Sequence, residues 1–324
     1  MNNSRYCNWG IFGPGRIARK FAEGLKSLPD ARLYAVSSRS EKRAEAFRRE
    51  FGFEKAYGSY DQMLADPLLD VVYIATTNNL HFEHTIMCLE AGKAVLCEKP
   101  FALNCAQVEQ MIALAQRKKV FLMEALCSRF MPSMLALKSQ IDGDIIGKPV
   151  MLQCDFGFVS PFDPQNRVYS PELGGGSVPD IGIYPVFTAL YLFGYPVEIH
   201  VASIPCPTGT DWTTAVIFKH TDGEISMLSS SFQALLNNEA RVYGEKGCLK
   251  LHRLFSKTDR LSFIDNQDRQ TLLTSEMTGN GYNYEAAEVM RCLNLGLTES
   301  PAMSHRFSMD LILLIDIITK KAFK

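Results

Sequence analysis

The sequence lacks a charge excess of either sign, a paired cysteine motif and a long apolar run. Its 34 basic and 35 acidic residues leave a formal net charge of −1, so no electrostatic attraction favours a nucleic acid or an anionic membrane as partner. The nine cysteines include no CxxC pair, and we interpret them as reduced, mostly buried thiols. No apolar run approaches the roughly 18 residues of a membrane span, and no secretory leader is recognisable. We therefore expect a cytoplasmic protein whose partners are small molecules.

Internal repeats and low-complexity tracts are also absent, so the fold has to be inferred from the alternation of elements. A chain of 324 residues suits two domains at the usual size of roughly 100 to 200 residues each. We place the first domain at residues 1–126 and the second at residues 127–324.

Residues 6–126 alternate short apolar runs with helical periodicities, a pattern typical of parallel strands joined by crossover helices. One helical face is marked by Ile17, Phe21, Leu25 and Leu28. The sequence thus predicts an α/β domain with a doubly wound, Rossmann-type parallel sheet. Its strands are expected at Asn8–Phe12, Leu33–Ser37, Val71–Ala75, Ala94–Cys97 and Val120–Met123.

After residue 126 the pattern changes to longer alternating stretches separated by glycine-containing turns, which predict a large, mostly antiparallel open sheet in an α+β domain. Helices are expected at Pro179–Leu192, Tyr284–Leu295 and Ser308–Lys320. A broad sheet with one uncovered face suggests pairing with a second subunit. The expected strands are Val150–Val159, Val197–Ser203, Ala215–Lys219, Ile225–Ser229, Arg241–Tyr243 and Cys248–Leu251.

The segment Gly13-Pro14-Gly15-Arg16-Ile17-Ala18 directly follows the first predicted strand and opens a helix, as a dinucleotide fingerprint does. Gly13 allows the tight turn and Gly15 lets the backbone approach a pyrophosphate, which the helix N-terminus faces. Ala18 replaces the third glycine and is small enough for close packing. An ordinary turn between strand and helix is the alternative interpretation.

The end of the second predicted strand decides between the two nicotinamide cofactors. A carboxylate here would hold the ribose 2′-hydroxyl of NAD, but the chain has Ser37-Ser38-Arg39-Ser40 followed by Lys42 and Arg43. Cations suit a 2′-phosphate, so we predict NADP rather than NAD. The alternative is a solvated basic helix start.

Polar residues also follow the strand Val71–Ala75, in the run Thr76-Thr77-Asn78-Asn79-Leu80-His81. They are expected at the carboxyl edge of the sheet, where the cofactor passes. His81 and His84 have a spacing found in metal sites, but no neighbouring cysteine or carboxylate cluster completes a ligand set, so we predict no metal.

The segment Val95-Leu96-Cys97-Glu98-Lys99-Pro100 ends a buried strand on a carboxylate and an amine. The proline keeps the backbone of Lys99 extended, so that its ammonium can project into a cleft. Glu98 would orient Lys99 or balance its charge, and a surface ion pair is the alternative for Glu98.

Asp180 and Tyr184 follow the glycines Gly174–Gly176 at a predicted helix start, and their spacing of four places both on one helix face. The ordinary pKa of tyrosine, near 10, makes it a poor base at neutral pH, but a neighbouring ammonium stabilises the phenolate. Lys99 would be such a neighbour of Tyr184. A core tyrosine is the alternative for Tyr184.

These motifs resemble those of the Gfo/Idh/MocA family of oxidoreductases and, within it, the dimeric dihydrodiol dehydrogenases. The resemblance covers nearly the whole chain. It is carried by the residues 13–18, 56–60, 91–100, 121–125, 174–176, 180–184 and 299–301.

The resemblance implies an NADP-linked dehydrogenase or carbonyl reductase in which Lys99, Tyr184 and Asp180 form the catalytic set and subunits pair through the C-terminal sheet. Tyr184 stands where many family members have histidine. The expected cofactor-binding residues are Gly13, Gly15, Arg16, Ile17, Ser38, Arg39, Arg43, Thr76, Thr77, Asn79, His81, Glu98, Lys99 and Arg129.

One departure bears on the substrate. Dihydrodiol dehydrogenases tend to carry tryptophan where this chain has Cys127, which puts an aromatic diol in doubt. Phe158, Phe162 and Arg167 are alternative pocket residues that suit a sugar or polyol, although core packing accounts equally well for Phe158. The rival to an enzyme is a non-catalytic NADP-binding sensor, which has no need of the set Lys99, Asp180 and Tyr184.

Overall fold

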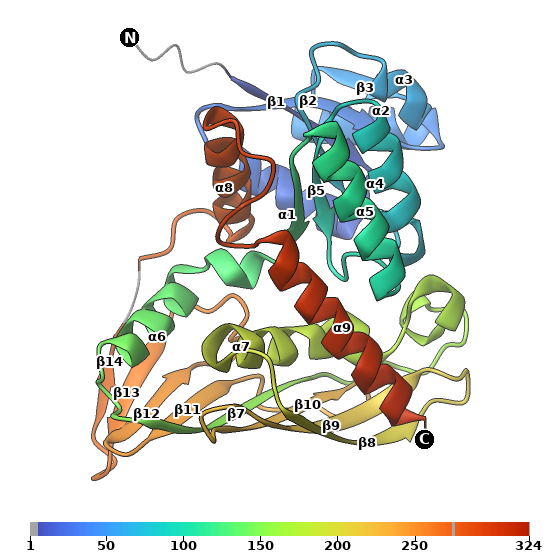
Figure 1. Ribbon diagram of the computed structural model, residues 1–324. Coiled ribbons are helices and arrows are strands. Elements are labelled where there is room, and N and C mark those ends of the chain that lie inside the picture. The colour runs from blue at the N-terminus through green and yellow to red at the C-terminus, as the bar shows by residue number, and fades with distance from the viewer. Residues whose placement is uncertain (1–5, 274–275, 324) are drawn as a thin grey trace. The chain divides into compact units, whose positions relative to one another are not determined.

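The computed structural model describes residues 6–273 and 276–323, and its contacts divide the chain into two compact units (Figure 1). The first unit comprises Met1–Cys127 and Thr278–Met309, and the second comprises Ser128–Met277 and Asp310–Lys324. The boundary that we placed at residue 126 lies next to the end of the first segment of the first unit. The sequence analysis did not anticipate that residues 278–309 also belong to the first unit. Their return to it is held by helix α8 (Tyr282–Asn294), which packs against α1 (Arg16–Leu25), and by the Leu122 amide, which donates to the Thr298 carbonyl.

The first unit is built on a six-stranded parallel sheet of order β3-β2-β1-β4-β5-β6, which confirms the predicted doubly wound fold. The order reverses between β1 and β4, where open sheets of this kind bind ligands at the carboxyl ends of the strands. The strands are β1 (Cys7–Phe12), β2 (Ala31–Ser37), β3 (Lys55–Tyr57), β4 (Val71–Ile74), β5 (Ala94–Glu98) and β6 (Leu122–Ala125).

The crossover helices lie on both faces of this sheet, because right-handed connections that run in opposite directions from the centre emerge on opposite sides. Accordingly α1 contacts α2 (Glu41–Phe51), whereas α4 (His81–Glu90) contacts α5 (Cys105–Lys118). A short helix, α3 (Tyr60–Leu64), follows β3. The predicted apolar face of α1 is buried at Phe21 and Leu25, but Leu28 lies beyond the end of the helix.

The second unit contains an eight-stranded sheet of order β14-β13-β12-β11-β7-β10-β9-β8. Every neighbouring pair is antiparallel except β7 and β10, so the predicted mostly antiparallel sheet is confirmed. Its strands are β7 (Pro149–Gly157), β8 (Glu198–Pro205), β9 (Asp211–Lys219), β10 (Ile225–Ser231), β11 (Ala240–Gly244), β12 (Gly247–Leu251), β13 (Leu261–Asp265) and β14 (Gln270–Leu272).

Helix α7 (Ile183–Phe193) packs on one face of this sheet, against β7 and β10. It is preceded by a π-helical turn, Val178–Gly182, which replaces the first turn of the helix predicted at Pro179–Leu192. Helix α6 (Pro132–Asp142) contacts β12 and β13. The last helix, α9 (His305–Ala322), passes from the first unit to the second after Met309.

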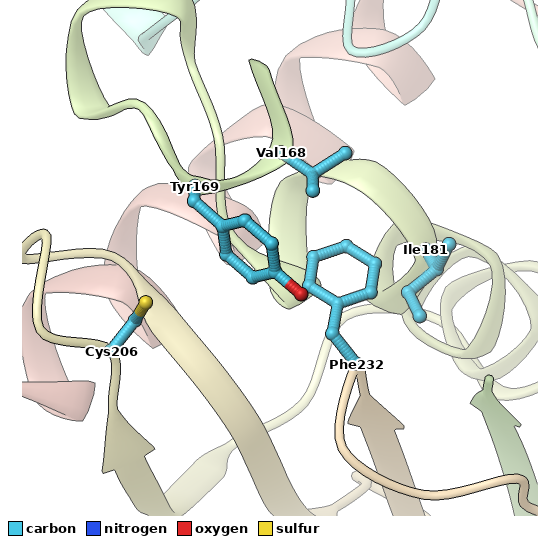
Figure 2. Close-up of a cluster of buried hydrophobic side chains, with 5 residues drawn as sticks. All are labelled: Val168, Tyr169, Ile181, Cys206 and Phe232. Carbon is cyan, nitrogen blue, oxygen red and sulfur yellow. The ribbon is translucent and has the colours of Figure 1, made fainter. Parts of the chain in front are cut away.

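A buried cluster of side chains lies beside the π-helical turn in the second unit. Figure 2 shows Tyr169 and Phe232 between Val168, Ile181 and Cys206. Phe156 and Trp212 pack against this cluster from the neighbouring strands. All nine cysteines of the chain are free thiols, and within residues 6–273 and 276–323 no helix is both long enough and apolar enough to cross a membrane.

Candidate active site

The turn after β1 has the backbone that a phosphate-binding loop requires. Gly13 has φ +83°, and a Cβ there would lie 2.9 Å from Thr76 Cγ2, so only glycine fits. Gly15 differs, because a Cβ added to it would meet nothing closer than the Gly13 carbonyl oxygen at 3.9 Å. The chain itself therefore does not demand a glycine at position 15, and the space above its backbone is open to a ligand.

The N-terminus of α1 is left without a capping side chain. Gly15 is its N-cap residue, and its first turn, which includes Arg16 and Ile17, contains no acidic residue. By contrast, Ser40, Ser59 and Asn104 cap α2, α3 and α5 through their side-chain oxygens. The N–H groups of this first turn and the positive end of the helix dipole thus remain available to an anion.

The cations predicted to choose the cofactor stand directly after β2. Ser38 is buried and accepts a hydrogen bond from the Ser40 amide at 3.2 Å, whereas Arg39 and Arg43 are exposed. Burial raises the pKa of Tyr60 while Arg39 and Arg43 oppose that rise. The pKa of His84 is lowered to about 4 by burial and by Arg39. The charge of Arg39 thus acts on the pKa values of both Tyr60 and His84.

The polar run after β4 is organised by short contacts. Thr77 Oγ1 donates to Asn79 Oδ1 at 2.7 Å, and Thr76 Oγ1 lies 3.0 Å from His84 Nδ1. His81 is buried, with Nδ1 2.8 Å from the Pro100 carbonyl oxygen and Nε2 3.2 Å from the Thr76 carbonyl oxygen. Both of its ring nitrogens thus face backbone groups of the protein.

Glu98 ends strand β5 and Lys99 follows it, at the same edge of the sheet as Gly15. The Glu98 carboxylate is buried and accepts hydrogen bonds from the Tyr73 hydroxyl and, at 3.2 Å, from the Lys99 amide. Tyr73 in turn stacks on Phe21 at a centroid distance of 3.7 Å. Glu98 therefore holds the backbone amide of Lys99. No sequence motif pointed to Tyr73, because it lies in an apolar strand.

In the second unit the three-glycine turn is forced by close backbone packing. A Cβ on Gly175 would lie 2.6 Å from the Arg167 carbonyl oxygen, and Gly176 has φ +125° and leaves room for Asp211. The Gly176 amide donates to the Val168 carbonyl at 2.9 Å. The glycines thus bind the turn to the segment that carries Arg167.

Asp211 anchors the start of the π-helical turn, a role that the sequence analysis did not identify. Its Oδ2 accepts hydrogen bonds from the Val178 amide at 2.9 Å, the Thr214 hydroxyl at 3.1 Å and the Ser177 hydroxyl. Burial raises the pKa of Asp211 while these donors oppose that rise. The signal was hidden because Asp211 lies far from this turn in the sequence and begins an ordinary strand.

Asp180 and Tyr184 lie on either side of the junction between the π-helical turn and α7. Arg167 Nη2 donates to Asp180 Oδ1 at 3.0 Å, so two residues predicted for different roles form an ion pair. In the run Ile181–Leu190 every residue other than Tyr184 is buried. The Tyr184 ring lies 5.5 Å from that of Phe156, centroid to centroid. A partly exposed tyrosine on an otherwise buried helix is consistent with a functional hydroxyl.

The expected pocket residues divide between the two units. Phe158 and Phe162 are exposed, and their rings contact Phe232 and Trp212 respectively. Cys127 is buried at the end of the first unit. Arg129, expected to bind the cofactor, belongs to the second unit and places its guanidinium 4.4 Å from the ring centroid of Tyr191. Among the residues that the structure describes, no three His, Cys, Asp or Glu side chains gather into a group able to hold a metal ion.

Comparison with known proteins gives matches to both halves of the chain. Residues 7–126 match the family model described as an oxidoreductase family with an NAD-binding Rossmann fold, and residues 134–250 match the Gfo/Idh/MocA C-terminal domain. Trans-1,2-dihydrobenzene-1,2-diol dehydrogenase of Mus musculus is 37% identical over 307 residues, which cover 91% of this chain and 90% of the mouse protein. The Homo sapiens protein of the same name is 33% identical over 311 residues, with 91% and 90% covered.

Solved structures share the fold over nearly the full length. An aldose-aldose oxidoreductase from Caulobacter crescentus, in complex with glycerol, has a TM-score of 0.90 at 24% identity, with 98% of each chain covered. A 3-ketoreductase from Actinomadura kijaniata in complex with NADP and TDP-benzene has a TM-score of 0.88 at 23% identity, with the same coverage. A levoglucosan dehydrogenase in complex with NADH and levoglucosan has a TM-score of 0.88 at 20% identity, again covering 98% of each chain.

Proposed function

The chain belongs to the Gfo/Idh/MocA family of NAD(P)-binding oxidoreductases, and from this premise we propose that it is an NADP-dependent dehydrogenase or reductase of a small diol, sugar or dicarbonyl. The family and its relatives make it an oxidoreductase that acts on CH–OH groups. The choice of NADP, the roles of Lys99 and Tyr184 and the substrate class are our proposal.

One observation carries the proposal. The first unit places an open glycine backbone, an uncapped helix N-terminus and a lysine at the carboxyl edge of one parallel sheet. The open space at Gly15 fits a pyrophosphate, and the Arg39 and Arg43 guanidinium groups suit a 2′-phosphate. When bound there, the nicotinamide cofactor would supply the hydride acceptor or donor.

We assign the proton chemistry to the chain's own residues. Tyr184 exchanges a proton with the substrate oxygen, and Lys99 supplies the positive charge that favours its phenolate form. Asp180, held by Arg167 at 3.0 Å, accepts a hydrogen bond from a substrate hydroxyl. We assign Phe158, Phe162 and Arg167 to the binding of a polyol or sugar, and we keep Cys127 as a further substrate residue.

The test is a panel of sugars, vicinal diols and dicarbonyls incubated with NADP or NADPH, followed by absorbance of the reduced nicotinamide. The panel includes trans-1,2-dihydrobenzene-1,2-diol because proteins of that activity are 33% and 37% identical to this chain. We expect turnover on at least one member. Tight NADP binding with no turnover on any of them would instead support the sensor interpretation.

Replacing Arg39 with alanine is expected to weaken NADP binding by about 1.5 to 3 kcal/mol, the usual worth of a charged hydrogen bond, and to leave NAD binding nearly unchanged. Titration of cofactor fluorescence or calorimetry measures both affinities. Arg49→Ala is the control, because Arg49 is an exposed cation in the last turn of α2, at the opposite end of that helix, and should have little effect. Equal losses for NADP and NAD would mean that Arg39 acts only through the fold.

We further propose that the protein is a homodimer formed through the outer face of the eight-stranded sheet. The other face is covered by α7, but the outer face exposes Ile217, Ile225 and Met227 by 39–45%. These residues adjoin one another, since Met227 pairs with Ile217 across the strands and Ile225 lies two residues before Met227 on the same face of β10. A contiguous exposed apolar face of this kind is typical of an interface.

Light scattering at micromolar concentration should therefore report two subunits. Ile217→Glu should convert the dimer to a monomer, because it places a charge in the centre of the proposed interface. Leu68→Glu, at an exposed residue of the first unit, is the control and should leave the dimer intact. A monomeric wild-type protein would refute pairing through the sheet.

A further inference from the structure

Two backbone groups directly after Lys99 are held by the side chains of His81 and Glu124. The proposed function gives neither side chain a role in proton transfer. The Pro100 carbonyl oxygen lies 2.8 Å from His81 Nδ1, and the Phe101 amide donates to Glu124 Oε1 at 3.1 Å. His81 begins α4 and Glu124 lies in β6, so both come from other elements of the first unit. The segment that follows Lys99 is thus fixed from two sides.

The protonation of His81 can be assigned from its two contacts. The ring is 1% exposed, and burial lowers its pKa to about 4, so it is neutral at neutral pH and carries one N–H. Both nitrogens face carbonyl oxygens, at 2.8 Å from Nδ1 and 3.2 Å from Nε2. We assign the proton to Nδ1, because the contact of Nδ1 with a carbonyl oxygen is the shorter of the two. His81 therefore donates its only hydrogen bond to Pro100, beside Lys99.

Glu124 supports the same segment from within the sheet. It is 2% exposed, and its pKa is raised to about 7 by burial, while hydrogen bonds from Ser308 and Phe101 and the charge of Lys99 oppose that rise. A carboxylate this deeply buried has no access to a substrate. Its hydrogen bond to the Phe101 amide, two residues after Lys99, puts Glu124 in place to act on Lys99 indirectly.

We propose that His81 and Glu124 are positioning residues, which hold the Lys99 ammonium in its reactive place by fixing Pro100 and Phe101. This inference rests on the proposed role of Lys99 and gives His81 a task other than cofactor binding. His81 also lies against the Thr76 carbonyl, so its ring joins the loop after β4 to the loop after β5. A shift of about 1 Å in a reacting group can lower turnover by on the order of 10²-fold.

Three substitutions of His81 separate its two contacts. The amide of asparagine takes the place of Nδ1 and keeps the contact with Pro100. The amide of glutamine takes the place of Nε2 and keeps the contact with Thr76, whereas leucine keeps neither. We expect His81→Leu and His81→Gln to lower kcat by about 10- to 100-fold with NADPH affinity nearly unchanged. His81→Asn should restore most of the loss, because it keeps the hydrogen bond to Pro100. Restoration by glutamine and not by asparagine would overturn the assignment.

Amide hydrogen exchange of residues 98–103, measured by mass spectrometry, tests whether this segment is held in place and does not depend on turnover. Exchange there should be faster in the leucine and glutamine variants and close to wild type in the asparagine variant. If the wild type turns over no substrate, the proposed function fails while this measurement still decides the inference. Exchange at the wild-type rate in all three variants would overturn the inference. A variant that binds NADPH more weakly but exchanges no faster would also overturn it. If His81→Leu does not fold, the asparagine and glutamine variants decide.

Substitutions of Glu124 provide a second, independent test of the inference. Glu124→Gln keeps an oxygen that accepts from the Phe101 amide, whereas Glu124→Leu leaves that buried amide without a partner. We therefore expect the glutamine variant to keep wild-type exchange at residues 98–103 and the leucine variant to accelerate it. Glu109→Leu, at an exposed position on α5, is the control. Equally accelerated exchange in Glu124→Gln and Glu124→Leu would show that Glu124 acts through its charge, and wild-type exchange in both would show that it does not hold Phe101. Either outcome would overturn the positioning role of Glu124.

Discussion

Replacing Tyr184 with phenylalanine is expected to lower turnover by roughly 10²- to 10⁴-fold, the usual contribution of a general acid or base. The substitution keeps the ring and its contact with Phe156 at 5.5 Å, so folding and cofactor affinity should persist. Steady-state kinetics on the substrate found by the panel, with NADPH titration beside it, measures the separation of these effects.

Tyr191→Phe is the matched control for this experiment. Tyr191 lies on the same helix, and its ring supports the Arg129 guanidinium, a contact that phenylalanine preserves. Loss of that hydroxyl should leave turnover within about twofold of wild type. If Tyr184→Phe also retained near wild-type turnover, Tyr184 would be a packing residue, and the proton carrier would have to be sought at Lys99 or Asp180.

Replacing Lys99 with methionine should cost as much turnover as Tyr184→Phe or more, because it removes the charge that makes the tyrosine a usable proton carrier. Methionine retains the length and apolar stem of lysine. The backbone of Lys99 should stay in place, because its amide is held by Glu98 at 3.2 Å. Thermal melting and hydrogen exchange are therefore expected to match wild type.

The double variant gives the sharper result. If Lys99 and Tyr184 act as one set, Lys99→Met combined with Tyr184→Phe should be little slower than the slower single variant. Losses that multiply would show that the two residues work independently. That outcome would remove Lys99 from the proton transfer and would leave it as a residue that binds cofactor or substrate.

The parallel sheet could be predicted from the sequence because its central strands are continuous apolar runs. The strand predicted at Val120–Met123 begins two residues later, at Leu122, since the Val120 amide still donates to the Ala115 carbonyl at the end of α5 and only the carbonyl of Phe121 bonds to β5, through the Val95 amide. The strand Lys55–Tyr57 was missed because it is short, lies at the edge and begins with lysine. The pattern of apolar residues indicates which side chains are buried, and buried side chains also occur outside the hydrogen-bonded part of a strand.

The candidate site was predictable where one short segment carries both the motif and its context. Gly13, Gly15 and Lys99 are of this kind, since each directly follows a recognisable strand. The residues that hold Glu98, Phe101 and the π-helical turn in place were not predictable. These residues, Tyr73, Glu124 and Asp211, come from distant elements and have no local pattern of their own. The same holds for the ion pair between Arg167 and Asp180, whose members the sequence analysis treated separately.

The return of residues 278–309 to the first unit has a consequence for biosynthesis. The sheet of that unit is encoded by the end of β6, but α8, which covers α1, is translated only after the whole of residues 128–277. At about 5 to 20 residues per second, the nascent first unit waits on the order of ten seconds or more with that side of α1 uncovered. Ending translation near residue 127 should therefore yield an aggregation-prone fragment rather than an independent cofactor-binding domain.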